Sequence, residues 1–243
     1  MPEHVAPLPA ILTAPAKLTL SLRITGRRDD GFHLLDAEMV TLDLCDTLEL
    51  AEGDGLDVVD GATGHARQVE AGDDNLVRRA LAMTGRRAHV RLHKRIPPGA
   101  GLGGGSADAA AVLRWAGVDD LAAAARLGAD VPFCLVGGRA RVRGIGEIVE
   151  RLPVEARTLT LWTPPFGCAT PAVYRAWDEL GGPRGDHGND LEAAALAVEP
   201  RLAAWRDRFA DVTGVRPRLA GSGSTWFVEG DHPGDGRVVV RTI

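Results

Sequence analysis

Apolar and polar residues alternate along several short segments of this chain, and a period of two is typical of half-buried β-strands. Residues 12–25 alternate, Pro15 and Gly26 bound a predicted strand at 17–24, and a turn follows at 26–31. Further along, alternation at 88–94 places Val90 and Leu92 on one face. The pattern therefore predicts strands or extended chain at residues 17–24, 38–51, 56–59, 88–94, 138–152, 157–163 and 226–229.

The segments between these strands carry helical signals. Asn75 is a suitable N-cap for the apolar run that follows it, and small residues dominate the segments after residue 105. The sequence predicts helices at residues 76–83, 106–116, 121–127, 172–180, 191–197 and 200–209, with loops at 53–72 and 221–224. The most natural domain boundary lies near residues 153–157, and it predicts domains of residues 1–153 and 154–243.

Bulk properties exclude several classes of protein. The chain has 243 residues, a net charge of −5 and no run of 18 apolar residues. An acidic chain of this kind disfavours nucleic acid or a membrane as the main partner. Its three cysteines have no paired spacing, so we expect reduced thiols and a cytoplasmic location.

The use of basic residues is unusual. The 28 basic residues include only two lysines, Lys17 and Lys94, and the rest are arginines. Asparagine is equally rare, at Asn75 and Asn189, and Tyr174 is the single tyrosine. Lysine and arginine are not interchangeable where a compact ammonium charge is required. These rare residues are therefore candidates for functional positions.

A glycine-rich segment follows the strand predicted at 88–94. It begins with Pro97 and Pro98, and five glycines fall between Gly99 and Gly105. Glycines let backbone N–H groups turn inward and approach an anion, and the helix expected from Ser106 adds its unpaired amides and its dipole. The segment therefore predicts a polyphosphate-binding loop.

Two better-known phosphate motifs fit this segment poorly. Gly99, Gly101 and Gly104 match the spacing of the dinucleotide fingerprint, but its acidic residue should end a second strand, and here that region reads as helix. The Gly-Lys-Ser/Thr of a Walker A loop is absent from the sequence. The loop is therefore of another kind.

Three motifs in order resemble those of the GHMP kinases, the group of galactokinase, homoserine kinase and mevalonate kinase. They are residues 14–18 (APAKL), residues 98–107 (PGAGLGGGSA) and residues 219–224 (LAGSGS). Within this family, the chain most resembles the members whose alcohol substrate carries a cytidyl diphosphate. Further matching segments are residues 14–20, 24–26, 30–33, 46–48, 74–76, 94–97, 127–132 and 188–191, so the resemblance runs from about Thr13 to Phe227.

The resemblance implies a two-domain α+β GHMP-kinase fold with ATP and substrate meeting in the cleft between the domains. The N-terminal domain would be ribosomal-protein-S5-domain-2-like and bind ATP, and the C-terminal domain would be a ferredoxin-like α/β unit. The implied activity is ATP-dependent phosphorylation of a hydroxyl group, with ATP and Mg²⁺ as cofactors. We expect a monomer or weak dimer that binds no nucleic acid.

The resemblance also implies roles for individual residues. Asp130 would accept the hydroxyl proton, and Lys17 would stabilise the developing charge. Ser106 is also a candidate contact for Mg²⁺. The residues implied for ATP are Asn75, Lys94, Pro97, Pro98, Gly99, Ala100, Gly101, Leu102, Gly103, Gly104, Gly105, Ser106 and Ala107. The residues implied for the cytidyl substrate are Thr19, Phe32, His33, Thr170, Pro171 and Tyr174.

The chain departs from the family pattern in three ways. The family usually has Asn in place of Thr19 and Tyr in place of Phe32, although Phe32 can still stack on a base and Thr19 keeps a hydroxyl. The loops near 60–70 and 181–189 are short. Two alternatives stay open: a GHMP kinase for another alcohol, such as homoserine or a mevalonate derivative, and a catalytically silent binding protein with this fold.

Overall fold

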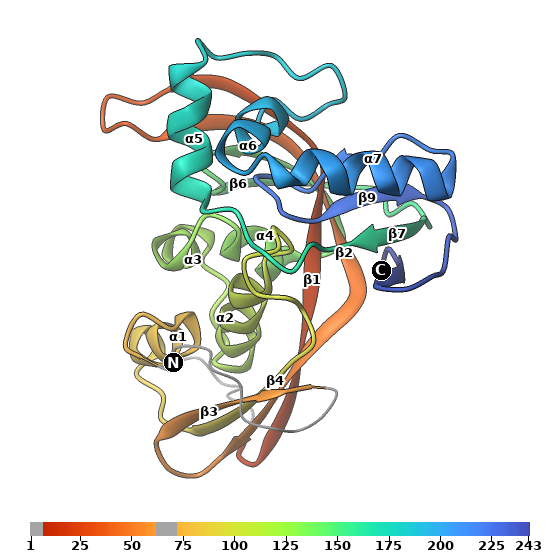
Figure 1. Cartoon of the computed structure of the whole chain (residues 1–243). Helices are drawn as coiled ribbons and strands as arrows, with labels where there is room; N and C mark the ends of the chain where they lie inside the picture. The colour runs from red at the N-terminus through yellow and green to blue at the C-terminus, as the bar shows by residue number, and fades with distance from the viewer. Residues whose placement is uncertain (1–6, 62–71) are drawn as a thin grey trace.

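The computed structural model describes residues 7–61 and 72–243 (Figure 1). Residues 62–71, which fall in the predicted loop at 53–72, lie outside this described part. Within it, no helix has both the length and the apolar character that a membrane crossing requires. Helices and two separate sheets make up the structure, so the predicted α+β class is confirmed.

The first sheet is built on two long antiparallel strands that pair along most of their length. The six strands of this sheet are β1 (Ala10–Arg27), β2 (His33–Ala51), β3 (Gly55–Asp60), β4 (His89–Lys94), β5 (Arg139–Gly144) and β6 (Ile148–Leu152). Strand β4 pairs with the C-terminal half of β2, and β5 pairs with its N-terminal half.

The first strand, β1, extends well beyond the predicted segment 17–24 and includes Pro15. Proline lacks an N–H group, but β2 is the only strand of the described residues that pairs with β1, and a register shift follows Pro15, so no ladder hydrogen bond at Pro15 is lost to a second strand. The expectation that Pro15 bounds the strand was therefore wrong, because proline is tolerated on an edge strand.

One layer of helices packs against this sheet, with α2 beside β1 at its centre (Figure 1). Its buried face consists largely of alanines, including Ala107, Ala109 and Ala110, which let the helix approach the sheet closely. The four helices are α1 (Leu76–Thr84), α2 (Gly104–Trp115), α3 (Leu121–Leu127) and α4 (Val131–Val136). Of these, α4 was not predicted, and α3 has its predicted bounds.

The second sheet has four antiparallel strands in the order β10–β7–β9–β8. Its strands are β7 (Thr158–Trp162), β8 (Arg218–Leu219), β9 (Trp226–Glu229) and β10 (Arg237–Arg241). The accompanying helices are α5 (Thr170–Glu179), α6 (Glu192–Val198) and α7 (Arg201–Thr213). The first sheet ends with β6 and the second begins with β7, but the exact boundary at 153/154 stays a prediction.

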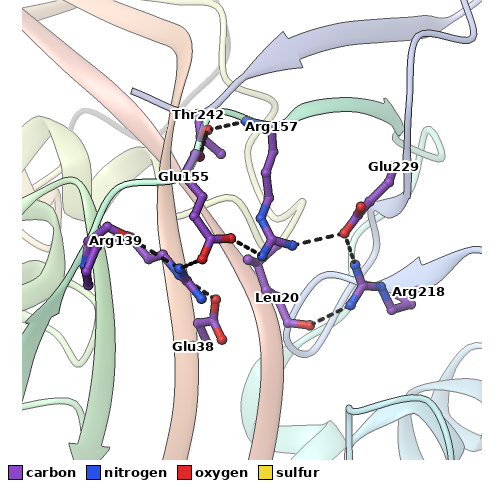
Figure 2. Close-up of polar contacts among 9 residues, drawn as sticks. Leu20, Glu38, Arg139, Glu155, Arg157, Arg218, Glu229 and Thr242 are labelled. Carbon is purple, nitrogen blue, oxygen red and sulfur yellow. Dashed lines mark hydrogen bonds and ion pairs between the residues drawn. The ribbon is translucent and has the colours of Figure 1, made fainter.

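A chain of ion pairs crosses from one sheet to the other (Figure 2). Glu155, in the link between the sheets, pairs with Arg139 of β5 and lies 2.7 Å from Arg157. Arg157 in turn contacts Glu229 of β9 at 3.0 Å. Glu155 and Glu229 are more than half exposed, so solvent screens the pairs that they make and the network orients the link more than it stabilises the fold. The residues labelled in Figure 2, which are joined by these ion pairs and by hydrogen bonds, are Leu20, Glu38, Arg139, Glu155, Arg157, Arg218, Glu229 and Thr242.

A second tie joins the loop before α6 to β1. The Leu22 N–H donates to Gly188 O at 2.7 Å, and the Asp190 N–H donates to Leu22 O at 3.0 Å. The Asp190 carboxylate accepts from the Ile24 N–H at 2.9 Å and pairs with Arg23 at 2.6 Å. The Asn189 side chain donates to Gly221 O at 2.7 Å, which holds the 221–224 loop in place.

We predict that Asp190→Asn lowers the free energy of unfolding by roughly 2–4 kcal/mol, because buried N–H donors lose their charged acceptor. Burial raises the pKa of Asp190, but hydrogen bonds from Gly185 and Ile24 outweigh burial and lower it. Because its pKa is lowered, the ionised carboxylate stabilises the fold at pH values above the ordinary pKa of an Asp. This stabilisation is lost as the pH falls through the lowered pKa of the folded protein. Urea unfolding at pH 7 and at about pH 3, below the ordinary pKa of an Asp, measures both effects.

Asp207→Asn is the matched control, since Asp207 is 63% exposed and, within residues 7–61 and 72–243, pairs with its neighbour Arg206 alone. It should change stability by no more than about 0.5 kcal/mol. Equal effects of the two substitutions, or an Asp190→Asn difference that does not shrink at about pH 3, would contradict the assignment.

Candidate active site

A cavity of about 450 Å³ opens where the first sheet and α2 face α5 and the 221–222 turn. Its walls come from β1, the glycine-rich segment, the first turns of α2, the residues before α4, the start of α5 and the 221–222 turn. Among the residues implied by the family resemblance, those lining it are Lys17, Thr19, Asn75, Lys94, Pro97, Pro98, Gly99, Ala100, Gly101, Leu102, Gly103, Gly104, Gly105, Ser106, Asp130, Thr170 and Tyr174.

The glycine loop turns through left-handed backbone at three positions: Gly99 (φ 69°), Gly101 (φ 78°) and Gly103 (φ 66°). Helix α2 begins at Gly104 rather than at the predicted Ser106. The side of the helix at Gly104 is crowded, since a Cβ there would lie 3.0 Å from Ile96 and from Lys94. A side chain at this position would force Ile96 or Lys94 to shift by a few tenths of an ångström.

The start of α2 leaves several backbone donors free of intrahelical partners. The Ala107 N–H donates to Gly103 O at 2.8 Å, so the N–H groups of residues 104–106 precede the first bond of the helix. They lie beside the cavity together with the positive end of the helix dipole. The arrangement suits a phosphate group.

Lys17 and Asp130 meet at this end of the cavity. The Lys17 ammonium lies 3.2 Å from the Asp130 carboxylate and donates to the Thr19 hydroxyl at 3.2 Å. Its backbone N–H donates to Leu102 O at 3.0 Å, which fixes β1 against the glycine loop. Lys17 is almost fully buried, whereas the Asp130 side chain is 32% exposed. The carboxylate therefore reaches the open part of the cavity while the ammonium is held behind it.

The other lysine is part of a buried cluster that the sequence did not reveal. The Lys94 ammonium pairs with Asp46 of β2 and with Asp108 of α2, the latter at 2.8 Å. Asp46 also accepts from the backbone N–H groups of Arg95 and Ile96. The cluster thus holds both ends of the glycine loop, and Lys94 and Asp108 line the cavity. Neither aspartate has a local signal in the sequence that would pair it with Lys94.

Asp108 carries a proton more readily than an ordinary aspartate. Burial, opposed by the charge of Lys94, raises the pKa of Asp108 to about 7. Between about pH 4 and pH 7 the folded protein therefore binds more protons here than the unfolded chain does. The free energy of unfolding should fall as the pH rises through this window.

The cavity wall does not include every residue implied by the resemblance. Ala107 is buried in the core, and Pro171 lies in the first turn of α5 outside the wall. Phe32 is 58% exposed at the tip of the β1–β2 hairpin. His33 stacks on Tyr174, with ring centroids 4.9 Å apart, and so lies behind the wall rather than in it.

Tyr174 and Thr170 place α5 at the cavity. Burial and the Asp130 carboxylate raise the pKa of Tyr174, so its hydroxyl stays protonated. Thr170 and Ser222 share a hydrogen bond of 2.9 Å, which joins α5 to the 221–222 turn. At the opposite end, Asn75 caps α1 through a bond from the Val77 N–H at 2.9 Å.

No group of three or more His, Cys, Asp or Glu side chains in residues 7–61 and 72–243 is arranged to hold a metal ion. Ser106 lines the cavity in the first turn of α2. The protein side of the site thus offers backbone amides, one ammonium–carboxylate pair and hydroxyl groups, a set of groups that suits phosphoryl transfer.

Known proteins share this architecture. Residues 75–138 match the model of the GHMP kinases N-terminal domain. A 4-diphosphocytidyl-2-C-methyl-D-erythritol kinase of Paracoccus denitrificans (strain Pd 1222) is 40% identical over 233 residues, covering 88% of this chain and 84% of the relative.

A crystal structure of 4-(cytidine 5'-diphospho)-2C-methyl-D-erythritol kinase superposes with a TM-score of 0.74 at 32% identity, covering 96% of this chain and 99% of that one. Mevalonate kinase of Methanococcus jannaschii, 12% identical, superposes with a TM-score of 0.58 over 97% of this chain and 98% of its own, and shares the fold.

This chain belongs to the GHMP kinases, a family of ATP-dependent small-molecule kinases, and has their two-domain α+β fold. Relatives that match it over most of its length share the name 4-diphosphocytidyl-2-C-methyl-D-erythritol kinase. The predicted family and fold class are therefore confirmed.

We predict that Gly101→Ala disrupts the site, because a Cβ there would lie 2.5 Å from Ala220 O and 2.7 Å from Gly223 O. Both atoms belong to backbone that has no flexible end to move. Gly85→Ala is the control, since Gly85 has a similar φ of 65° and no atom within 4 Å of the added carbon. The control should cost about 1–2 kcal/mol for the backbone conformation alone.

Gly101→Ala should cost about 1–3 kcal/mol more than the control and weaken ATP binding, which the control should leave unchanged. Urea unfolding and ATP titration measure the two effects. Equal destabilisation by both substitutions would refute the close approach of the two loops.

We further predict that Asp108→Asn flattens the dependence of stability on pH. The wild-type protein should lose stability between pH 4 and pH 7, and the variant should lose less, with a difference on the order of 1 kcal/mol. Urea unfolding at intervals of half a pH unit provides the measurement. Parallel curves for the two proteins would show that Asp108 is ionised throughout this range.

Proposed function

We propose that the chain transfers the γ-phosphoryl group of ATP to a hydroxyl of 4-diphosphocytidyl-2-C-methyl-D-erythritol and forms its 2-phosphate. This reaction is a step of the non-mevalonate, methylerythritol phosphate route to isoprenoid precursors. The proposal rests on the match to kinases of that name over most of the chain, together with the Lys17–Asp130 pair beside the glycine loop.

In the proposed mechanism, the glycine loop and the first amides of α2 bind the β- and γ-phosphates. Asn75, Lys94 and the two prolines at the entrance of the loop would enclose the adenosine. The Lys94 ammonium is already shared by two carboxylates. Its contribution would therefore come from its stem and backbone rather than from a charge directed at the phosphates.

Asp130 accepts the proton of the substrate hydroxyl while the hydroxyl oxygen forms a bond to the γ-phosphorus. The bond between that phosphorus and the β,γ-bridging oxygen breaks, and ADP leaves. Lys17, 3.2 Å from Asp130, pairs with the carboxylate and offsets the negative charge of the transferred group. Thr19 holds the ammonium in place through its hydroxyl.

Mg²⁺ fits this set of groups, because it takes most of its ligands from phosphate oxygens and water and needs few from the protein. The Ser106 hydroxyl, in the first turn of α2, would supply the protein oxygen. When bound, the ion neutralises charge on the phosphates.

The substrate would occupy the end of the cavity formed by Thr170, Tyr174 and the β1–β2 hairpin. Stacking of His33 on Tyr174 supports a nucleobase platform there. Pro171 and Phe32 would border this platform from outside the wall. A cytoplasmic location and a monomer or weak dimer remain predictions.

The first test of this function is an assay of ADP release with cytidyl-methylerythritol, homoserine and mevalonate as separate acceptors. We expect turnover with the cytidyl compound alone. Turnover with homoserine or mevalonate only would identify a kinase of another alcohol, and ATP binding without turnover on any acceptor would identify a silent binding protein.

We predict that Asp130→Asn lowers kcat by roughly 10²–10⁴-fold, because a positioned base is lost. Its ATP dissociation constant should stay within about threefold of wild type, since Asp130 does not hold the phosphates. Asp211→Asn, an exposed change on α7, should leave both quantities unchanged. A fully active Asp130→Asn enzyme would remove Asp130 from the proposed role.

A further inference from the structure

The tip of the β1–β2 hairpin lies against α5 (Figure 1), and His33 is the residue through which they meet. Its ring stacks on Tyr174 with an angle of 28° between the planes. The edge of the ring faces Trp177 at 5.6 Å between centroids and an angle of 90°. Two aromatic neighbours therefore fix the plane of the imidazole, and its side chain is 9% exposed.

The fourth group at this junction is Asp178, which the sequence analysis gave no role. Its Oδ1 lies 2.8 Å from Nε2 of His33, and its Oδ2 lies 3.5 Å from Arg27 of β1. Arg27 thus occupies one carboxylate oxygen and leaves the other to the histidine. Within the described residues, Asp178 is the charged side chain that contacts the ring, and Arg27 is the charged side chain behind it.

The contact with Asp178 determines which nitrogen of His33 carries a proton. An ionised carboxylate accepts hydrogen bonds and donates none, so Nε2 must be the donor. In the neutral imidazole, Nδ1 then carries a lone pair and can only accept. The described part of the chain provides no hydrogen bond to Nδ1, and this atom is not among the unpartnered polar atoms that are sealed from solvent. Nδ1 is therefore available to a ligand.

Tyr174 connects this histidine to the cavity. One face of its ring meets His33, and the residue itself lines the cavity close enough to Asp130 for that carboxylate to raise the pKa of its hydroxyl. The platform of His33 and Tyr174 thus lies at the substrate end of the proposed reaction site. Thr170, one turn earlier on α5, lines the same end.

We propose that Asp178 is a positioning residue that makes the site selective for an aminopyrimidine. By holding the proton at Nε2 of His33, it presents the Nδ1 lone pair to a ligand. Cytosine offers an amino group that can donate to this lone pair, whereas uracil has a carbonyl oxygen at the same ring position. Two acceptors facing each other leave both unpaired, which strongly disfavours the wrong base.

This inference rests on the proposed function only in taking the ligand to be a pyrimidine nucleotide. The test is a calorimetric titration of the intact protein with CDP and, separately, with UDP. A saturating non-hydrolysable ATP analogue blocks the glycine-loop site, and pH 8 is chosen because histidine is ordinarily neutral there. We expect wild type to bind CDP at least tenfold more tightly than UDP.

Asp178→Asn should reduce the preference for CDP to less than about threefold, because an amide can donate to Nε2 and move the proton to Nδ1. An amide in place of the carboxylate of a histidine–aspartate pair is known to impose the wrong tautomer in this way. Asp178→Glu, which keeps an acceptor, should retain part of the preference. The affinity for the ATP analogue should not change, since Asp178 lies outside the cavity wall.

Glu179→Gln is the matched control, because it removes a neighbouring charge of α5 from an exposed position without touching His33. It should keep the full preference for CDP. The ¹⁵N shifts of the His33 ring give a second readout: the proton should be at Nε2 in wild type and in Glu179→Gln, and at Nδ1 in Asp178→Asn.

The outcomes separate this inference from the proposed function. If wild type binds neither CDP nor UDP, the proposed substrate is wrong. If wild type prefers CDP and Asp178→Asn keeps that preference, or loses affinity for both nucleotides equally, the substrate stands and the role of Asp178 is refuted. An Nδ1 proton in the wild-type spectrum would refute it as well.

Discussion

One buried ammonium, placed between two carboxylates, determines the shape of the proposed ATP site. Lys94 ends β4, Asp46 lies on β2 and Asp108 lies on α2, so the cluster joins the elements on either side of the glycine loop. Removing one member of such a group leaves an uncompensated buried charge, which is strongly destabilising. The loop itself can be rich in glycine and still keep a single conformation, because both of its ends are fixed.

The same loop also makes contact with the second sheet. The absence of a side chain at Gly101 lets the loop lie against the backbone of residues 220–223, and the Thr225 N–H donates to Ala100 O at 3.1 Å. Asn189 holds the 221–224 loop from the other side. These contacts with backbone atoms, rather than the solvent-screened ion pairs of Figure 2, therefore set the position of the second sheet relative to the phosphate loop.

Local patterns in the sequence predicted most elements, since alternation and capping act over a few residues. They missed α4, because a six-residue helix with a proline at its start resembles a turn after Asp130. They also missed β8 and β10, whose formation depends on pairing with β9 and β7. For the site, rarity and motif order singled out Lys17 and Asp130, but Asp46, Asp108 and Asp178 meet their partners only through the tertiary fold.

The scarcity of lysine has a chemical consequence. Both lysines of the chain are buried to about 95%, with 5% of each exposed, and both are paired with carboxylates. Reagents that acylate amines therefore find no lysine side chain on the outer surface of the folded protein. An electrophile carried by a nucleotide could reach these two amines only by entering the cavity, so covalent capture would occur inside the site or not at all.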